Sequence, residues 1–110
     1  MEVTMSVIGN IPVAAVKGEV VAENVTDLKK ILGDLLATDR VKVVLDFEQM
    51  DYIDSSGLAA LISRSNDFRK KRGDLHLAAM NDTVRKAFDV TFLSRHFRIF
   101  PTVEEALKAF

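Results

Sequence analysis

Residues 41–58 read VKVVLDFEQMDYIDSSGL and contain the clearest pattern of a strand followed by a helix. The first five residues, Val41 to Leu45, are almost continuously apolar and rich in β-branched side chains, which is typical of a strand covered on both faces within an α/β sheet. A polar loop is predicted from Asp46 to Asp54. Apolar residues then recur at helical spacing, which predicts a helix that begins at the double serine and buries Leu58, Leu61, Ile62, Ser65 and Phe68.

The residues before this stretch predict two strands and a helix. Residues 3–7 alternate apolar with polar side chains, and a second apolar run extends from Ile11 to Val16. Gly9-Asn10 supplies a tight turn between the two strands, and Gly18 is expected to close the second one. Further along, apolar residues fall three and four apart, which predicts a helix whose buried stripe is Val25, Leu28, Ile31, Leu32, Leu35 and Leu36.

The residues after residue 58 continue the alternation of helix and strand. A cationic run at 69–72 followed by Gly73 predicts the last turn and C-cap of the central helix. A strand from Leu75 to Ala79 is followed by a helix capped by Asn81 or Asp82, with Val84, Ala87 and Phe88 facing inward. A last strand at 97–100 precedes a helix that starts at a Thr102 and Glu105 capping box and buries Val103, Ala106, Leu107 and Phe110.

This order of elements predicts a single α/β domain over residues 1–110 with about four helices. The sheet is expected to be mixed but mostly parallel, with one antiparallel strand at the amino terminus. Ligands and modifications of such sheets tend to lie at the carboxyl ends of the strands. The loop from Asp46 to Gly57 is expected at that edge.

Composition excludes several classes of function. The 15 basic and 16 acidic side chains nearly cancel and form no long block of one sign, so no broad positive field is available for nucleic acid or an anionic membrane. The absence of cysteine excludes a disulfide framework, a thiolate metal site and a cysteine nucleophile. No signal-peptide pattern and no membrane-length apolar run is present. We therefore expect a cytoplasmic protein that binds neither nucleic acid nor membrane directly.

The segment Asp54-Ser55-Ser56-Gly57 is the main candidate for a functional site. Ser and Asp are favoured helix N-caps because their side-chain oxygens accept from unpaired first-turn N–H groups, so capping alone explains one serine. Capping does not explain two adjacent hydroxyls, nor a glycine in the first turn, which costs about 1 kcal/mol relative to Ala unless another group must approach closely there. A regulatory serine is the alternative interpretation.

Residues 43–47 and 50–58 together resemble the signature of the anti-sigma factor antagonist family, the bacterial branch of the STAS domains. The likeness continues outside this signature. Gly18-Glu19-Val20 is similar to the family's Gly-Glu-Leu step before the first helix, Arg72-Gly73-Asp74-Leu75 to its helix-to-strand turn, and Val84-Arg85-Lys86-Ala87-Phe88 to its third helix. The resemblance spans nearly the whole chain and implies a STAS fold.

The resemblance implies a partner-switching regulator that is not an enzyme and needs no cofactor. In its unmodified form, such a protein captures an anti-sigma factor that is also a serine kinase using ATP, and so releases a sigma factor to RNA polymerase. The kinase phosphorylates the serine directly after the Asp, here Ser55, and the complex dissociates. A phosphatase of the PP2C type then restores the hydroxyl, and Ser56 serves mainly the helix start.

The same resemblance implies a partner-binding surface around this serine. We expect the surface to include the first turn of the central helix and the nearby end of the second strand: Asp54, Ser55, Ser56, Gly57, Leu58, Glu19 and Val21. Val21 stands where family members often carry an Asp. Contacts with the kinase, or the turnover of the phosphoserine, are expected to differ accordingly.

Two other assignments use the acidic residues of the same loop. Asp46, Glu48, Asp51 and Asp54 carry the oxygen ligands of a hard-cation site. Asp46 also invites comparison with the phosphoacceptor of a response-regulator receiver domain. A receiver needs an acidic pair after its first strand and a Lys before a Pro after its last, where this chain offers Gly9-Asn10 and Phe100-Pro101. The receiver is therefore the weaker hypothesis.

A hydrolase would need a base within reach of Ser55. The two imidazoles are those of His76, inside a predicted strand, and His96, in a connecting segment, and we expect structural roles for both. The Gly-x-Ser-x-Gly elbow is absent.

A further alternative keeps the fold and makes the chain a signalling or ligand-sensing module of a stress-response assembly. The basic run at 69–72 is expected to be a solvated helix end rather than a nucleic-acid patch. Phe88, Phe92, Phe97, Phe100 and Phe110 are expected in the core, and would mark a second interface if several were exposed together.

Overall fold

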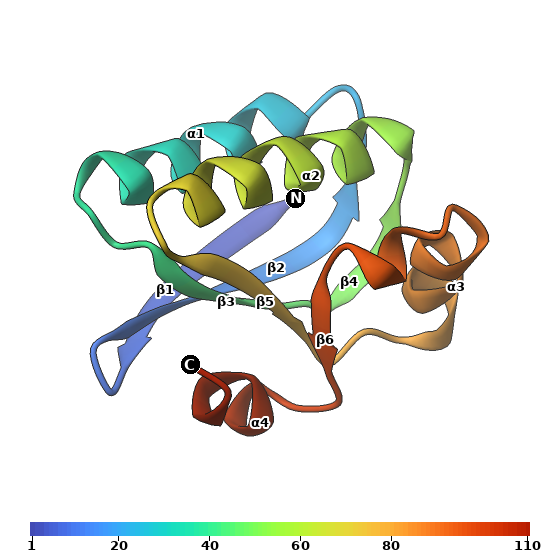
Figure 1. The fold of residues 1–110 in the computed structure, drawn as a ribbon. Helices are drawn as coiled ribbons and strands as arrows, with labels where there is room; N and C mark the ends of the chain where they lie inside the picture. Colours follow the sequence, from blue (N-terminus) through green and yellow to red (C-terminus); the bar gives the residue numbers. More distant parts are fainter.

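A computed structural model describes residues 1–110 (Figure 1). The elements in chain order are β1 (Glu2–Ile8), β2 (Ile11–Val20), α1 (Val25–Ala37), β3 (Lys42–Asp46), β4 (Met50–Ile53), α2 (Ser55–Lys70), β5 (Asp74–Ala78), α3 (Asp82–Val90), the single-turn 3₁₀ helix η1 (Leu93–Arg95), β6 (Arg98–Phe100) and α4 (Val103–Lys108). No helix combines the length and apolar character needed to cross a bilayer.

The strands form one mixed sheet in the order β1-β2-β3-β5-β6, and β4 pairs with the far end of β2. β1 runs antiparallel to β2, whereas every other pairing is parallel. Figure 1 shows α1 and α2 side by side on one face, α4 on the opposite face and α3 beyond β4. The predicted α/β fold, with its mostly parallel sheet, antiparallel amino-terminal strand and four helices, is confirmed.

The β1–β2 connection is the predicted two-residue turn. Gly9 has φ 56° and Asn10 has φ 68°, and the strands close on the pair Ile8 and Ile11. Two consecutive positive φ values are characteristic of a type I′ turn, whose twist matches that of the strands it joins.

The core lies on both faces of the sheet. Alternate residues of β3 point to opposite sides, so Val43 and Leu45 join the large cluster beneath α1 and α2, while Val44 joins a smaller cluster beneath α4. All three side chains are fully buried. The prediction that β3 is covered on both faces is therefore confirmed, because helices pack on each side of it.

The predicted polar loop from Asp46 to Asp54 is wrong in part, because it contains β4. Met50 and Ile53 of this strand are buried, and β4 pairs with β2 beyond the point where β3 has ended its own pairing. Gly18 does not close β2. It has φ 91° and already pairs with Met50 of β4, at a register shift between Gly18 and Glu19 within the β2–β4 ladder.

The end of α2 also differs from expectation. Arg72, rather than Gly73, takes the left-handed conformation, with φ 64°. Gly73 is required for a different reason, since a Cβ there would lie 1.9 Å from the carbonyl oxygen of Val41. The chain passes too close to Val41 at this point for any side chain.

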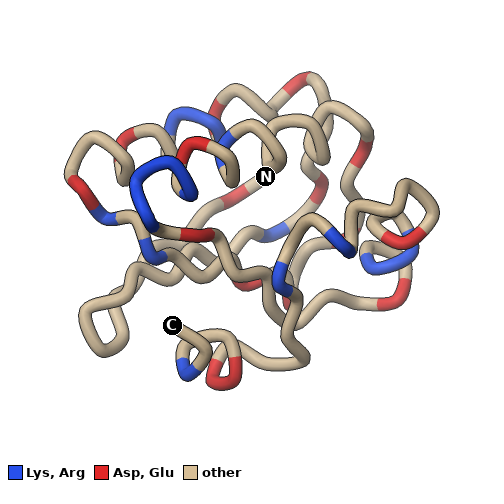
Figure 2. Tube along the Cα trace, in the orientation of Figure 1, with Lys and Arg blue, Asp and Glu red and all other residues tan.

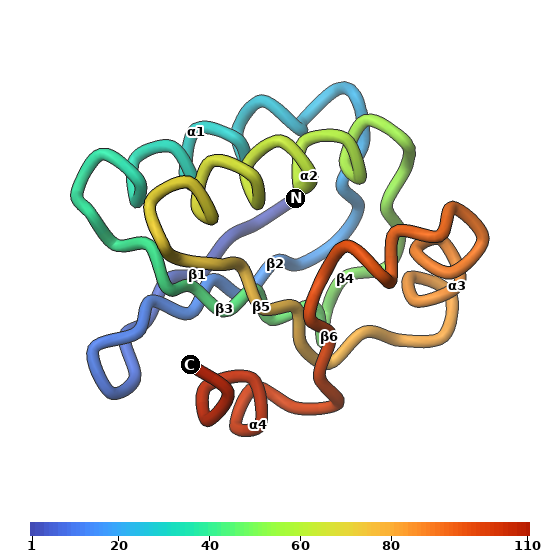
Figure 3. The backbone as a smooth tube through the Cα atoms, in the orientation of Figure 1, coloured from blue at the N-terminus to red at the C-terminus, as the bar shows by residue number.

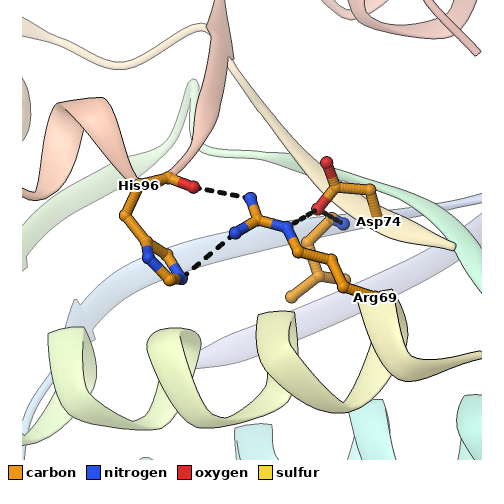
Figure 4. Close-up of polar contacts among 4 residues, drawn as sticks. Arg69, Asp74 and His96 are labelled. Carbon is orange, nitrogen blue, oxygen red and sulfur yellow. Dashed lines mark hydrogen bonds and ion pairs between the residues drawn. The ribbon is translucent and has the colours of Figure 1, made fainter. Parts of the chain in front are cut away.

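Arg69 is not the simple solvated residue that was expected. Figure 4 shows its guanidinium between the carboxylate of Asp74 and His96. Nε donates to Asp74 Oδ1 at 3.0 Å, and the other guanidinium nitrogens contact the His96 carbonyl oxygen and its ring Nε2. Arg69 thus joins the end of α2 to the start of β5 and to the segment before β6.

The prediction that all five phenylalanines lie in the core fails for Phe92. Phe88 and Phe97 are buried, and Phe100 and Phe110 pack against the cluster beneath α4. Phe92 is 73% exposed and adopts φ 61° in the turn that follows α3. The chain reverses there, which places the ring outside the packed layers.

Candidate functional site

The N-terminus of α2 is capped by Asp54 rather than by either serine. Asp54 Oδ1 accepts from the backbone N–H of Gly57 at 3.0 Å. Ser55 is the first helical residue and is exposed, and Ser56 is half-buried. The serine hydroxyls are therefore not used for capping, so the simplest structural explanation for the two serines does not apply. Asp54, and not Ser56, makes the bond that caps the start of the helix.

The second oxygen of Asp54 ties α2 to another part of the chain. Oδ2 accepts from the N–H of Ala22 at 3.1 Å, and the Asp54 N–H donates to the Val20 carbonyl at 3.1 Å. Figure 3 shows the β2–α1 and β4–α2 connections side by side at the same edge of the sheet. One carboxylate thus orients two loops as well as the helix.

Asn24 organises the neighbouring loop, and the sequence analysis did not identify it. Its Oδ1 accepts from the N–H of Val21 at 3.0 Å, while its Nδ2 donates to the Glu19 carbonyl at 2.9 Å. An Asn just before a helical stripe is a cap signal, although here its side chain closes the loop in front of α1 instead of capping that helix.

Gly57 allows β2, β4 and α2 to meet. A Cβ at this position would lie 2.6 Å from Cγ1 of Ile53 and 3.0 Å from Cγ1 of Val20. Both distances are too short for carbon atoms in contact. This close approach accounts for a glycine in the first turn of a helix, where its conformational freedom is otherwise a disadvantage.

The remaining residues of the expected surface are divided between rim and interior. Glu19 is exposed and Val21 is half-buried, whereas Leu58 is only 6% exposed and packs in the core. Tyr52 is 48% exposed and pairs with Glu19 in the β2–β4 ladder. Tyr52 was missed because β4 was not predicted.

The two stretches of sequence that contain the site carry one sign of charge. Residues 19–28 and 46–63 contain seven carboxylates and no Lys or Arg: Glu19, Glu23, Asp27, Asp46, Glu48, Asp51 and Asp54. Elsewhere both colours occur along the trace in Figure 2, with the longest blue run at residues 69–72. The two connections that present Ser55 therefore carry only acidic charges in a chain whose net charge is −1, and Lys17 of β2 lies in the same hollow as Asp46 and Glu48.

Neither histidine contacts Ser55. His76 is 2% exposed, bonds through Nδ1 to the Ala106 carbonyl at 2.8 Å and stacks on Phe110 with ring centroids 3.6 Å apart. His96 lies against Arg69 and Phe97. Burial lowers the pKa of both imidazoles. The expected structural roles fit these contacts, and the arrangement supplies no base to the serine.

The acidic loop does not form a cation cage. Asp46 Oδ1 accepts from the N–H of Glu48 at 3.0 Å, and Asp54 is engaged by Gly57 and Ala22. No group of three or more His, Cys, Asp or Glu side chains is arranged to hold a metal ion.

Comparison with known proteins relates the whole chain to bacterial regulators. A Bordetella bronchiseptica protein that carries the name of an anti-sigma factor antagonist, BtrV, is 29% identical over 110 residues, which is 100% of this chain and 95% of the relative. The anti-sigma-B factor antagonist of Listeria monocytogenes is 25% identical over 79 residues, covering 72% of this chain and 69% of the relative.

Solved structures share the fold at lower identity. An anti-sigma factor antagonist from Mycobacterium paratuberculosis superposes with a TM-score of 0.89 at 23% identity, covering 98% of this chain and 92% of the other. Unphosphorylated SpoIIAA, an anti-sigma factor antagonist, has a TM-score of 0.83 at 23% identity over 98% of this chain and 95% of its own. The model of the STAS domain matches residues 2–106, so this chain belongs to the STAS domain family.

Proposed function

We propose that this protein is a cytoplasmic anti-sigma factor antagonist. In this proposal the unphosphorylated chain binds an anti-sigma factor that is also a serine kinase, so that a sigma factor is released. Phosphorylation of Ser55 ends the interaction, and a PP2C-type phosphatase reverses it. The names of the Bordetella and Listeria relatives support this assignment. No catalytic role is proposed for the chain itself.

The observation that carries the proposal is the position of the Ser55 hydroxyl. It is exposed on the first residue of α2, and Asp54 makes the capping bond that a serine at this place would otherwise make. A kinase can reach such a hydroxyl without opening the fold. A buried or capping serine would have to lose a structural bond first.

The folded domain is expected to tolerate the phosphate. The group adds about −1.5 to −2 charges at neutral pH. A helix N-terminus stabilises a nearby anion by roughly 0.3 to 1 kcal/mol through its dipole and free N–H groups. The phosphate would also remain in water, because Ser55 is exposed.

A complex that buries Ser55 at its interface is not expected to tolerate the phosphate. The segments around Ser55 offer no Lys or Arg to neutralise a dianion, and Asp54 is adjacent. Burying an unpaired charge costs several kcal/mol, which corresponds to a loss of affinity of about a thousandfold or more. Phosphorylation thus separates partners without unfolding the domain.

The proposed partner-binding surface follows the exposed rim of the site. Asp54, Ser55, Ser56, Glu19 and Val21 are accessible to different degrees. Gly57 and Leu58 support this surface from beneath, since both are buried. The acidic character of the edge favours a partner surface that is basic, because complementary potentials speed association.

The test is incubation with ATP and candidate anti-sigma kinases from the same cell, followed by mass spectrometry. We expect one phosphate on Ser55, its loss in Ser55→Ala, and its retention in the matched neighbour variant Ser56→Ala. In a binding assay, Ser55→Asp should bind the kinase much more weakly than Ser55→Ala while keeping the same melting temperature. Phosphate on Ser56 alone, or equal binding by the two Ser55 variants, contradicts the proposal.

A further inference from the structure

β1 is a long open edge of the sheet. The strand order places it at one end, paired with β2 on one side only. Native proteins usually protect such an edge with a Lys, a proline, a bulge or a very short strand. β1 has seven residues, and its register with β2 is unbroken. Its single charged residue is Glu2, and the six residues that follow are VTMSVI. Apart from Glu2 at its first residue, β1 has none of these protections.

The turn geometry determines which backbone groups of β1 are free. In a two-residue hairpin the closing pair, Ile8 and Ile11, is hydrogen-bonded, and the bonded pairs then alternate along the strands. The N–H and C=O groups of Val3, Met5 and Val7 therefore point away from β2 and toward the open edge. Pro12 lies opposite Val7, in a pair that needs no N–H from it.

The side chains of the same residues make this edge apolar. Residues 3, 5 and 7 share one face of the strand, because side chains alternate along it. Met5 is 44% exposed and Val7 is 57% exposed. Met5 also lines an open hollow of about 500 Å³ together with Ile31, Leu35, Asp34, Thr38 and Arg40 of the α1 region.

We propose that β1 pairs antiparallel with β1 of a second copy of this chain, about a two-fold axis at Met5. The free backbone groups are spaced symmetrically about that residue. In this register Met5 opposes its own copy and Val3 opposes Val7 of the partner copy, so every free N–H and C=O of the three residues acquires a partner. A shift of register in either direction leaves some of them unpaired.

The charges of the edge are compatible with a second copy in this register. Glu2, the only charged residue of β1, opposes Ile8 of the other strand. The two Glu2 side chains are then six residues apart along the paired strands, roughly 20 Å, and are screened from each other by salt. The hollow beside Met5 holds one acid, Asp34, and one base, Arg40, so two facing hollows accumulate no excess of like charge.

An engineered disulfide tests the register directly, because the chain has no cysteine of its own. In Met5→Cys the two thiols face each other across the axis, where the Cα atoms of a bonded antiparallel pair lie about 5.5 Å apart, within disulfide range. In Val7→Cys they are four residues apart along the strands, roughly 13 Å, which is out of range. Mild oxidation should covalently dimerise Met5→Cys and leave Val7→Cys monomeric. Equal cross-linking of both variants overturns the proposed pairing.

Sedimentation equilibrium up to millimolar concentration tests the association without a cross-link. The wild-type chain should reach twice the mass of one chain, and Val7→Lys should remain monomeric at every concentration. Val90→Lys is the matched control, because Val90 is 63% exposed on α3, away from β1, and should dimerise as wild type does. Circular dichroism verifies that all three fold alike. A wild-type monomer throughout, or dimers of Val7→Lys, overturns the proposal.

Discussion

Individual residues at the start of α2 set the geometry of the candidate site. Asp54 accepts from Gly57 in its own helix and from Ala22 in the neighbouring loop. Gly57 lets that helix approach within contact of Ile53 and Val20. These neighbours hold Ser55 at the surface, where it is not part of the core packing. A chemical change at its hydroxyl is therefore expected to leave the free energy of unfolding nearly unchanged.

Gly57→Ala tests the close approach. The added methyl group would meet Ile53 and Val20 side chains in a buried place, and such overpacking costs about 1–3 kcal/mol. Gly33→Ala in α1 is the comparison, because its methyl group would meet only the Arg64 guanidinium, 2.9 Å away, which is bonded to the Lys29 carbonyl and to Asp67. That variant gains up to about 1 kcal/mol of helix propensity, which offsets the cost of shifting the guanidinium, so it should be less destabilised than Gly57→Ala. Urea denaturation measures both, and equal stability of the two variants would contradict the packing argument.

At the scale of elements, Arg69 joins three segments that lie apart in the sequence. Its guanidinium reaches Asp74 at the start of β5 and His96 before β6, as Figure 4 shows. The Arg69 and Asp74 side chains are 35% and 19% exposed, so the pair is better shielded from water than the helix pairs Lys30–Asp34, Arg85–Asp89 and Lys108–Glu104. The contact holds the end of α2 against the segment that enters β6.

Arg69→Met is therefore expected to lower the free energy of unfolding by about 1–2 kcal/mol, since bonds to charged groups are strong but water screens part of this one. Arg85→Met provides a matched comparison. Arg85 forms an exposed pair with Asp89 on α3, at 47% and 51% exposure, and its loss should cost less than about 0.5 kcal/mol. Denaturant titration of the two variants should give this order, and the reverse order would refute the role given to Arg69.

At the scale of the whole molecule, His76 connects the sheet to the α4 layer. It lies on the face of β5 opposite α1 and α2, bonds to the carbonyl of Ala106 and stacks on Phe110. Burial lowers its pKa below the ordinary 6.5, so the folded state favours the neutral ring. Protonation must therefore work against the packing of α4.

The sign of the pH dependence follows from this lowered pKa. Above pH 6.5 the ring is neutral in both states and stability is complete, whereas below it the unfolded chain binds a proton that the folded chain resists. The free energy of unfolding should fall from about pH 7.5 to about pH 5.5, above the range of ordinary carboxylates. His76→Gln should flatten this slope, while His96→Gln should retain the part due to His76. An unchanged slope in His76→Gln would rule out this origin.

The elements that the sequence predicted well are those determined by neighbours along the chain. The Gly9-Asn10 turn, the helical stripes of α1 and α2, and the caps Asn81 and Thr102 depend on contacts within a few residues. The segment Asp54-Ser55-Ser56-Gly57 was also identified in this way. It combines a cap, a helix start and a glycine whose presence a local pattern could detect but not explain.

The features that local patterns did not predict depend on residues distant in the sequence. β4 has four residues and no alternating pattern, and it becomes a strand because the end of β2 is free to pair with it. The bond from Ala22 to Asp54 and the packing of Val20 against Gly57 likewise join parts of the chain about thirty residues apart. Local periodicity and capping signals were enough to predict the four helices, every strand except β4, and the location of the serines. The exposure of Ser55 and the contact between the β2–α1 and β4–α2 connections were decided by the sheet, because strand pairing brings together segments that no local pattern relates.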